Sequence, residues 1–328
     1  MFQQKMPLYS KNRQSGIAAV ERWNVGGINQ WVMMRGMDIK KPLLLFLHGG
    51  PGIAQIGFAR SFQKELEEHF VVVNWDQRGS GLSFSKQISP ASMNVNQFVQ
   101  DTLEVTTKLL ERFQRPKLYL VGHSWGSILG MLAIKQKPEY FYAYYGIGQI
   151  SDMLQNEEFC YQYSLNEAQK RGWQKAVKEL GSLGPRPFTD QKSLNIQRKW
   201  LGRLGGIYHE VNVPALMLKG MLASKEYGWM DLIRYTAGTF FSTKTMWPEI
   251  AKINVAGKVP EVNVPVIINA GKYDYSTPSE LSRHYYQTLR APDKGWFWFE
   301  RSGHSPHFEE PERFREVVLS TYRTYSQY

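Results

Sequence analysis

The sequence contains very little cysteine and no long hydrophobic run. Cys160 is the one cysteine in 328 residues, which excludes an internal disulfide and is typical of a protein from a reducing compartment. No glycine-flanked turn surrounds it, so we interpret Cys160 as a small buried residue and not as a reactive thiol. The longest apolar runs, such as residues 43–47, are far too short to span a bilayer.

The first residues, MFQQKMPLYSKNRQSG, also lack the apolar core and the small-residue cleavage site of a signal peptide. We therefore expect a cytoplasmic protein that does not associate with a membrane. The formal net charge is +11, but the sequence has no block of lysine and arginine and no nucleic-acid-binding motif. A solvated basic surface is the simpler interpretation, and the charge could at most steer anionic substrates.

Hydrophobic residues make up 42% of the chain, enough for a sizeable core. Apolar runs at 43–47, 70–75, 118–121, 141–147, 264–270 and 295–300 alternate with helix-compatible segments at 96–113, 127–136, 277–289 and 311–325. This alternation predicts an α/β fold with a mostly parallel sheet covered by helices on both faces. Residues 17–25 and 28–35, joined by Gly26-Gly27, are expected to form an additional hairpin.

Residues 151–260 differ from the rest of the chain because they contain no hydrophobic strand run. A capping-box pattern at 164–167 predicts a helix start there, and a second one at 277–280 predicts the start of a later helix. We expect three parts: a first part of the core at 1–150, a helical cap or lid at 151–260, and a second part of the core at 261–328.

The sequence Gly122-His123-Ser124-Trp125-Gly126 lies between a predicted strand and a predicted helix. In that context Gly-x-Ser-x-Gly is typical of a sharp turn that presents the serine as a nucleophile at the start of the helix. Glycine at both ends of the motif lets the strand and helix backbones approach closely. We therefore predict that Ser124 is a nucleophile.

A serine nucleophile needs a base, and the base needs a carboxylate to orient it. His304 follows the predicted strand at 295–300, and Asp274 follows the strand at 264–270. The order Ser124, Asp274, His304 is that of the α/β-hydrolase arrangement. His307 is the competing base, and Asp76 is a competing carboxylate that we interpret as part of a turn with a local Asp–Arg pair. His123 should point away from the site and serve packing.

The oxyanion of such a mechanism needs two backbone N–H donors. Trp125, the residue after the nucleophile, is expected to supply one of them. Gly50, in the loop that follows the strand at 43–47, is the best candidate for the other.

Five motifs together resemble those of the α/β-hydrolase superfamily, and more narrowly those of the proline iminopeptidase family: HGGPG at 48–52, DQRGSG at 76–81, GHSWGS at 122–127, KYD at 272–274 and SGHSPHFEEP at 302–311. The resemblance implies an α/β-hydrolase fold, the triad Ser124, Asp274 and His304, and an oxyanion hole formed by Gly50 and Trp125. Members release N-terminal residues, often proline, from short peptides without a cofactor or metal. The nucleophile is serine, whereas epoxide hydrolases and haloalkane dehalogenases of this fold use aspartate.

The same family binds the free α-amino group of its substrate through glutamates in the lid. This sequence has no clear Gly-Glu-Trp-like lid motif, and Glu157, Glu158 and Glu226 are candidate amine ligands by charge alone. The leading hypothesis is a serine hydrolase that forms an acyl-enzyme and removes N-terminal residues from short peptides. The alternatives are a carboxylesterase or lactonase with the same triad, and a hydrolase-fold protein that binds a ligand without catalysis.

Overall fold

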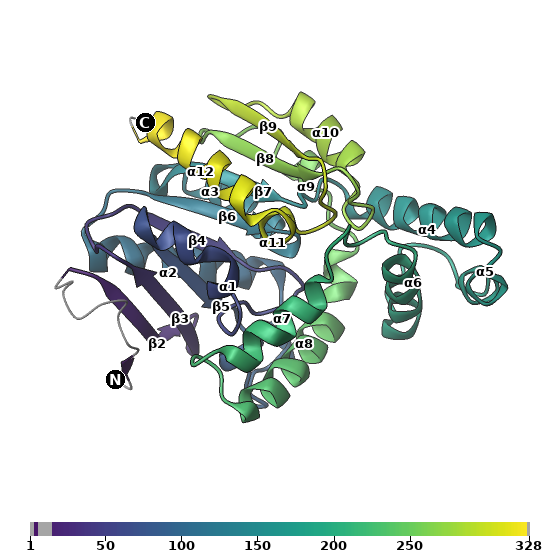
Figure 1. The fold of residues 1–328 in the computed structure, drawn as a ribbon, viewed down its shortest axis with the longest axis horizontal. Coiled ribbons are helices and arrows are strands. Elements are labelled where there is room, and N and C mark those ends of the chain that lie inside the picture. Colours follow the sequence, from purple (N-terminus) through teal and green to yellow (C-terminus); the bar gives the residue numbers. More distant parts are fainter. Residues whose placement is uncertain (1–2, 6–14, 327–328) are drawn as a thin grey trace.

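In the part of the chain that the structure describes, nine strands form one sheet in the order β1-β2-β3-β5-β4-β6-β7-β8-β9. The structure is a computed structural model that describes residues 3–5 and 15–326 (Figure 1). The strands are β1 (Gln3–Lys5), β2 (Ile17–Val25), β3 (Ile28–Gly36), β4 (Leu43–Leu47), β5 (Val71–Asp76), β6 (Leu118–His123), β7 (Phe141–Ile147), β8 (Val266–Gly271) and β9 (Lys294–Phe299).

The three N-terminal strands pair antiparallel, and β3 also pairs antiparallel with β5. From β5 to β9 every neighbouring pair is parallel. The β2–β3 hairpin turns at Gly26 and Gly27, whose φ angles are +55° and +77°, in the left-handed region that glycine adopts without steric cost. The predicted mostly parallel sheet and its N-terminal hairpin are confirmed.

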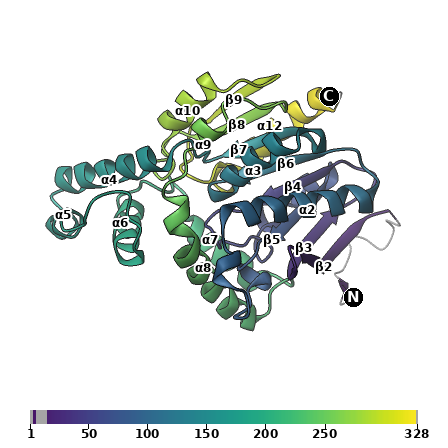
Figure 2. The same ribbon diagram turned by 180° about the vertical axis from the view of Figure 1, so that it is seen from behind.

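Alternate residues of β4 face opposite sides of the sheet, and each side is packed. Leu43 and Leu45 belong to the same buried cluster as residues of α2 (Val95–Phe113) and α3 (Trp125–Gln136). Leu44 and Phe46 instead pack with Phe314 of α12 (Pro311–Tyr325). Figure 1 shows α12 in front of the sheet, and Figure 2 shows α2 and α3 on the opposite face. Burial of both faces explains why β4 is a continuous apolar run.

The helices of the core flank the strands as the alternation predicted. They are α1 (Arg60–Gln63), α2 (Val95–Phe113), α3 (Trp125–Gln136), α10 (Ser279–Thr288), α11 (Pro306–Glu309) and α12 (Pro311–Tyr325). In the described ranges 3–5 and 15–326, no helix has both the length and the apolar character needed to cross a bilayer.

Residues 151–260 lie between β7 and β8 and are mainly helical. The helices there are α4 (Met153–Lys170), α5 (Gln174–Gly181), α6 (Gln191–Arg203), α7 (Val213–Ala223), α8 (Trp229–Ile250) and α9 (Val255–Lys258). We call this part the helical segment. Figure 1 shows α4, α5 and α6 projecting away from the sheet, while α7 and α8 run beside each other below it.

The expected helix start at 164–167 is wrong. The helix α4 already begins at Met153, where the Asp152 carboxylate accepts hydrogen bonds from the N–H groups of Leu154 and Gln155. Ser164 lies inside this helix and its hydroxyl donates to the carbonyl of Cys160 at 2.8 Å. A capping-box sequence inside a longer helix satisfies its side chains within the helix, so the pattern alone does not fix a boundary. Cys160 is fully buried, as expected.

Candidate active site

Ser124 occupies a strained turn between β6 and α3. Its φ and ψ angles are 53° and −118°, a region that non-glycine residues rarely adopt. A Cβ atom added to Gly122 would lie 2.6 Å from the carbonyl oxygen of Gly126, and one added to Gly126 would lie 2.1 Å from that of Leu47. Only glycine at both positions allows α3 to pack directly against the strands, and that packing presents Ser124 at the carboxyl edge of the sheet.

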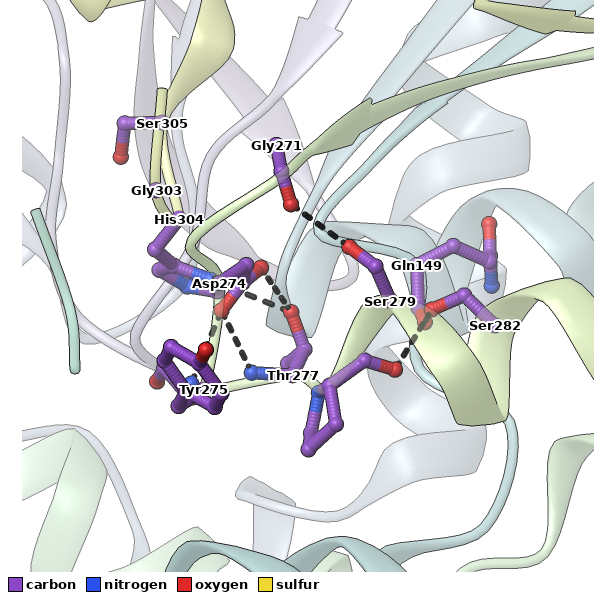
Figure 3. Close-up of polar contacts among 12 residues, drawn as sticks. Gln149, Gly271, Asp274, Tyr275, Thr277, Ser279, Ser282, Gly303, His304 and Ser305 are labelled. Carbon is purple, nitrogen blue, oxygen red and sulfur yellow. Dashed lines mark hydrogen bonds and ion pairs between the residues drawn. The ribbon is translucent and has the colours of Figure 1, made fainter. Parts of the chain in front are cut away.

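His304 and Asp274 meet at the same edge. His304 Nδ1 lies 3.0 Å from Asp274 Oδ2, and the two side chains come from the loops that follow β9 and β8 (Figure 3). Both residues are buried. The hydrogen bond to Asp274 orients the imidazole through Nδ1 and leaves Nε2 for another partner.

The Asp274 carboxylate is held by three further donors. Its Oδ1 accepts hydrogen bonds from the N–H groups of Ser276 and Thr277, each at 2.8 Å. The Thr277 hydroxyl donates to Oδ2 at 2.7 Å and lies 3.1 Å from His304 Nδ1, as Figure 3 shows. The expected capping box at 277–280 is therefore wrong: α10 begins at Ser279 with Pro278 as its cap and has no side-chain cap. The sequence pattern assigned Thr277 to a helix cap, so its hydrogen bond to the Asp274 carboxylate was missed.

Residues 147 and 148 link Ser124 to His304. The N–H of Ser124 donates to the carbonyl of Ile147 at 2.9 Å. A Cβ atom on the next residue, Gly148, would lie 2.9 Å from His304 Cε1, and Gly148 has a φ of +51°. The imidazole thus packs against the loop that is hydrogen-bonded to the serine, and both Ser124 and His304 line the same cavity.

The loop after β4 packs against the nucleophile turn. A Cβ atom on Gly49 would lie 3.2 Å from Ser124 Cβ, so Gly50 and the start of α3 lie on neighbouring walls of the cavity. The N–H of Trp125 is at the first residue of α3, where helix N–H groups have no acceptor within the helix. Gly50 and Trp125, the predicted oxyanion donors, therefore line the same cavity as Ser124.

Gln77 connects the loops of two sequence motifs. Its side-chain amide donates to the carbonyl of His48 at 3.1 Å, and its side-chain oxygen accepts from the Trp125 indole at 3.0 Å. The N–H of Gln77 also donates to His48 Nε2. Burial lowers the pKa of His48 to about 4, which keeps its imidazole neutral and able to accept that bond. Gln77 was not singled out from the sequence, although the motif DQRGSG contains it.

Two further histidines are buried near His304. The ring centroid of His123 lies 5.0 Å from that of His304 and 4.6 Å from that of His307. Burial lowers the pKa of His307 to about 3, with a smaller contribution from His304, and also lowers that of His123. Both ring nitrogens of His307 are buried without a hydrogen-bond partner, so His307 is not hydrogen-bonded to Asp274. Contrary to expectation, His123 does not point away, because it lines the cavity and its Nε2 lies 3.1 Å from the His304 carbonyl.

Asp76 is buried and is not one of the residues that line this cavity, and the expected local pair with Arg78 is wrong. Arg78 instead contacts Asp101, with Nε 2.8 Å from Oδ2. Asp76 accepts a hydrogen bond from the Tyr227 hydroxyl at 2.5 Å and others from the N–H groups of Leu82 and Ile56. Burial raises the pKa of Asp76 to about 7 against these hydrogen bonds. Asp76 thereby ties the core to the loop that precedes α8.

Glu309 braces the loop that carries His304. Its carboxylate accepts hydrogen bonds from the N–H groups of Gly303 and Ser305, each at 2.9 Å. It also accepts one from the N–H of His209 in the helical segment, at 2.7 Å. The N–H of His304 donates to the carbonyl of Ile207 at 2.6 Å. Residues 207–209 therefore help to position the imidazole.

Above these residues lies a cavity of about 510 Å³ between the sheet edge and the helical segment. Its wall includes apolar side chains from both parts, such as Ile53, Ile150, Met153, Leu194 and Trp247. Among the described residues that line it, none is aspartate or glutamate. Nor does the part of the chain described here hold a group of three or more His, Cys, Asp and Glu side chains suited to a metal ion.

The three glutamates predicted as amine ligands do not line this cavity. Glu157 is fully buried and paired with Arg198, and Glu158 pairs with Arg186 at 2.7 Å. Glu226 is buried beside Arg35, with 3.4 Å between Oε1 and Nη1. Each carboxylate is thus engaged by an arginine, and the structure does not bring them together at the triad.

Comparison with known proteins agrees with this geometry. Residues 44–317 match the model of the alpha/beta hydrolase family. Over 308 residues the chain is 42% identical to the probable aminopeptidase YbaC of Bacillus subtilis, covering 93% of this chain and 96% of that protein. It is 24% identical to a proline iminopeptidase of Clostridioides difficile over 85% of this chain and 88% of that one.

Among solved structures, the proline iminopeptidase of Mycobacterium smegmatis superposes with a TM-score of 0.67 at 18% identity, covering 93% of this chain and 98% of that one. That likeness shows a shared fold. The family match spans most of the sheet and the helical segment, and the resemblance predicted from the five motifs is confirmed. The chain therefore belongs to the alpha/beta hydrolase family and, within it, resembles the proline iminopeptidases.

Proposed function

We propose that this protein is a serine hydrolase that acts through an acyl-enzyme, with Ser124 as nucleophile, His304 as general base and acid, and Asp274 as the orienting carboxylate. The observation that carries the proposal is the buried His304–Asp274 pair, 3.0 Å apart, at the cavity that the strained Ser124 turn also lines. The main-chain N–H groups of Gly50 and Trp125 are the proposed oxyanion donors.

In this mechanism His304 Nε2 takes the proton of the Ser124 hydroxyl as Oγ attacks the substrate carbonyl. The carbonyl oxygen becomes an oxyanion, which the two N–H groups stabilise. The imidazolium, stabilised by Asp274, then gives its proton to the leaving nitrogen or oxygen, and that bond breaks. Water attacks the acyl-enzyme with the same base, which releases the carboxylic acid and restores the serine.

The helical segment would act as a lid over the sheet edge. Its helices α4, α6 and α8 contribute Met153, Leu194 and Thr239 to the cavity wall. Excluding water from such a cavity strengthens the electrostatic interactions within it. We accordingly keep the division into core parts at 1–150 and 261–328 with a lid at 151–260.

Two substrate classes fit this site. The similarity to a probable aminopeptidase and to proline iminopeptidases supports release of N-terminal residues from short peptides. The cavity supports a carboxylic ester, because none of the described residues that line it is acidic and a charged α-amino group would lack an anionic partner there. The triad serves both classes, since an amine and an alkoxide leave by the same protonation.

Labelling with a fluorophosphonate tests the mechanism, with Ser124→Ala as the control. We expect labelling of the wild-type protein and none of the variant; an unlabelled wild-type protein that is folded would favour a binding role without catalysis. Turnover of proline and alanine arylamides against 4-nitrophenyl hexanoate then separates the substrate classes. Exclusive ester turnover would exclude the peptidase assignment.

A further inference from the structure

One face of α6 forms part of the cavity wall. Gln191, Leu194, Asn195 and Arg198 all line the cavity, and their spacing of i, i+3, i+4 and i+7 is that of a single helix face. Figure 1 shows α6 well separated from the sheet strands. A ligand group in contact with this face would therefore lie away from the bond that Ser124 attacks, and three of the four side chains on the face are polar.

Arg198 is held in a fixed pose on that face. Its guanidinium donates to the Glu157 carboxylate and to the side-chain oxygen of Gln197. It also lies 5.2 Å from the ring centroid of Trp247, which lines the cavity as well. These contacts from three sides pre-orient the guanidinium, so a ligand need not order a free side chain.

The ion pair shows its cationic end to the cavity. The Arg198 side chain keeps 26% of its surface accessible, whereas that of Glu157 has none. Burial acts to lower the pKa of Arg198, but the neighbouring Glu157 carboxylate and Cys160 outweigh it, so the guanidinium stays charged. Glu157 Oε2 and Gln197 Nε2 are buried without a hydrogen-bond partner. The two side chains that hold the Arg198 guanidinium therefore each keep one polar atom without a hydrogen bond.

No described residue of the cavity wall carries a negative charge that would balance Arg198. Among the described residues of the cavity wall, Arg198 is the one arginine or lysine, and aspartate and glutamate are absent. His123, which also lines the cavity, is kept neutral because burial lowers its pKa. A guanidinium has five N–H donors, and two are engaged by Glu157 and Gln197. The remaining donors suit a planar anion, and they would disfavour an ammonium group placed beside them.

We propose that the substrate carries a carboxylate away from its scissile bond, and that Arg198 binds it with help from the amide side chains of Asn195 and Gln191. The proposal rests on the hydrolase function above and names its substrate class: esters or amides with an anionic end. Arg198 is thus a specificity-determining residue, and the buried Glu157 moderates the strength of its attraction.

Matched ester pairs test this proposal. The first pair is mono-4-nitrophenyl adipate and 4-nitrophenyl hexanoate, which have acyl chains of equal carbon number and differ in the terminal carboxylate. The second pair, 4-carboxyphenyl hexanoate and phenyl hexanoate, places the carboxylate on the leaving group. After correction for uncatalysed hydrolysis, we expect the wild-type protein to have a higher kcat/KM for the carboxylate member of at least one pair. The pair that responds identifies the side on which the carboxylate binds.

Arg198→Met should reduce kcat/KM for the preferred carboxylate ester by about 10- to 100-fold, the range expected for a lost hydrogen bond to a charged group. The ratio of kcat/KM between the carboxylate and the neutral member of that pair should therefore fall toward one. Arg198→Lys should recover part of the preference, because lysine keeps the charge without the planar fork. Glu157→Gln should act in the opposite direction and lower KM for the carboxylate ester, because it frees the guanidinium from its internal partner.

Arg198→Met leaves the Glu157 carboxylate buried without its partner, so the double variant Arg198→Met/Glu157→Gln is included to remove both charges. If it folds and retains the wild-type carboxylate preference, the proposal is overturned. Equal kcat/KM for both members of each pair in the wild-type protein would also overturn it, while hydrolysis of the neutral esters would leave the proposed function intact. Absence of all ester and arylamide turnover together with absence of fluorophosphonate labelling would instead count against the function itself.

Discussion

The two walls of the cavity are built differently. On the sheet side, the loops after β4, β6, β8 and β9 carry the proposed catalytic groups, and strands such as β4, β6 and β8 are buried at every residue. On the other side, the helical segment exposes large apolar side chains, including Trp229 at 74% and Leu222 at 67%. A wall backed by a packed sheet keeps its geometry, whereas a helical wall can change its side chains with little cost to the fold. Together with the proposed function, this contrast predicts that rate and substrate choice are set on different walls.

Asp274→Asn gives the strongest test of this contrast. Asparagine fills the same space but cannot stabilise the imidazolium, so kcat should fall by about 10³- to 10⁴-fold. The fall should be equal for all substrates, since the sheet wall does not select among them. Steady-state kinetics on the neutral and carboxylate esters would measure it. If the ratio of kcat between the neutral and carboxylate esters differs from that of the wild-type protein, the proposed division between the walls is wrong.

A pair of glycine substitutions compares the packing of the two parts. Gly126→Ala would place a methyl group 2.1 Å from the Leu47 carbonyl oxygen. Relief of this clash requires a shift of main-chain atoms, which is energetically costly. We expect a loss of about 3 kcal/mol in the free energy of unfolding. Gly181→Ala, at the end of α5 with no atom within 4 Å of the new methyl group, should instead stabilise the protein by about 0.5 kcal/mol. Urea unfolding would measure both; equal effects would contradict the difference in packing.

The buried histidines should make the sheet side sensitive to acid. His307 has a pKa of about 3 in the folded protein because of burial, against about 6.5 in the unfolded chain. Below pH 6.5 the unfolded chain therefore binds a proton that the folded protein does not, so stability falls as the pH decreases toward 3. Between pH 7 and pH 5, the free energy of unfolding should therefore fall by about 2 kcal/mol less in His307→Phe than in the wild-type protein.

Unfolding at the two pH values would measure this effect, with His284→Gln as the matched control because His284 is exposed. The control should keep the wild-type pH dependence. An unchanged pH dependence in His307→Phe would show that other groups dominate the acid response.

Thr277→Val should have the smallest effect. It removes the hydroxyl that donates to Asp274 at 2.7 Å and keeps the shape of the side chain, so kcat/KM should fall by about 10-fold for every substrate. Thr277→Ser retains the hydroxyl and should stay near the wild-type value. A large change in KM for Thr277→Val alone would mean that Thr277 binds substrate and does not position the carboxylate.

The sequence predicted the sheet side well and the helical side poorly, for physical reasons. Continuous apolar runs such as 43–47 identify buried parallel strands because both faces must be covered, and Gly-x-Ser-x-Gly between a strand and a helix leaves one geometry for Ser124. The strand ends then bring Asp274 and His304 to one edge, where the structure places them. These features depend on local pattern and sheet topology, which are readable from one sequence.

Tertiary partners were not readable in the same way. Arg78 pairs with Asp101 and not with the nearby Asp76. Thr277 donates a hydrogen bond to Asp274, although the sequence pattern around it suggested a helix cap. Arg198 was not singled out at all, because its role depends on which face of α6 meets the cavity. The i, i+3, i+4, i+7 spacing from Gln191 to Arg198 was present in the sequence, but the position of that face relative to the sheet follows only from the fold.

The hydrogen bonds at residues 207–209 couple parts of the molecule that are otherwise distinct. The Ile207 carbonyl accepts from the N–H of His304 itself, and Glu309 joins the N–H of His209 to the loop on both sides of that histidine. Displacement of this stretch of backbone would break the hydrogen bonds that position the imidazole. The helical segment therefore cannot move away from the sheet at this point without loss of the orientation of His304. Under the proposed mechanism, proton transfer would then occur only while the helical segment is in contact with the sheet edge. Water would not be activated when the acyl group is incompletely bound.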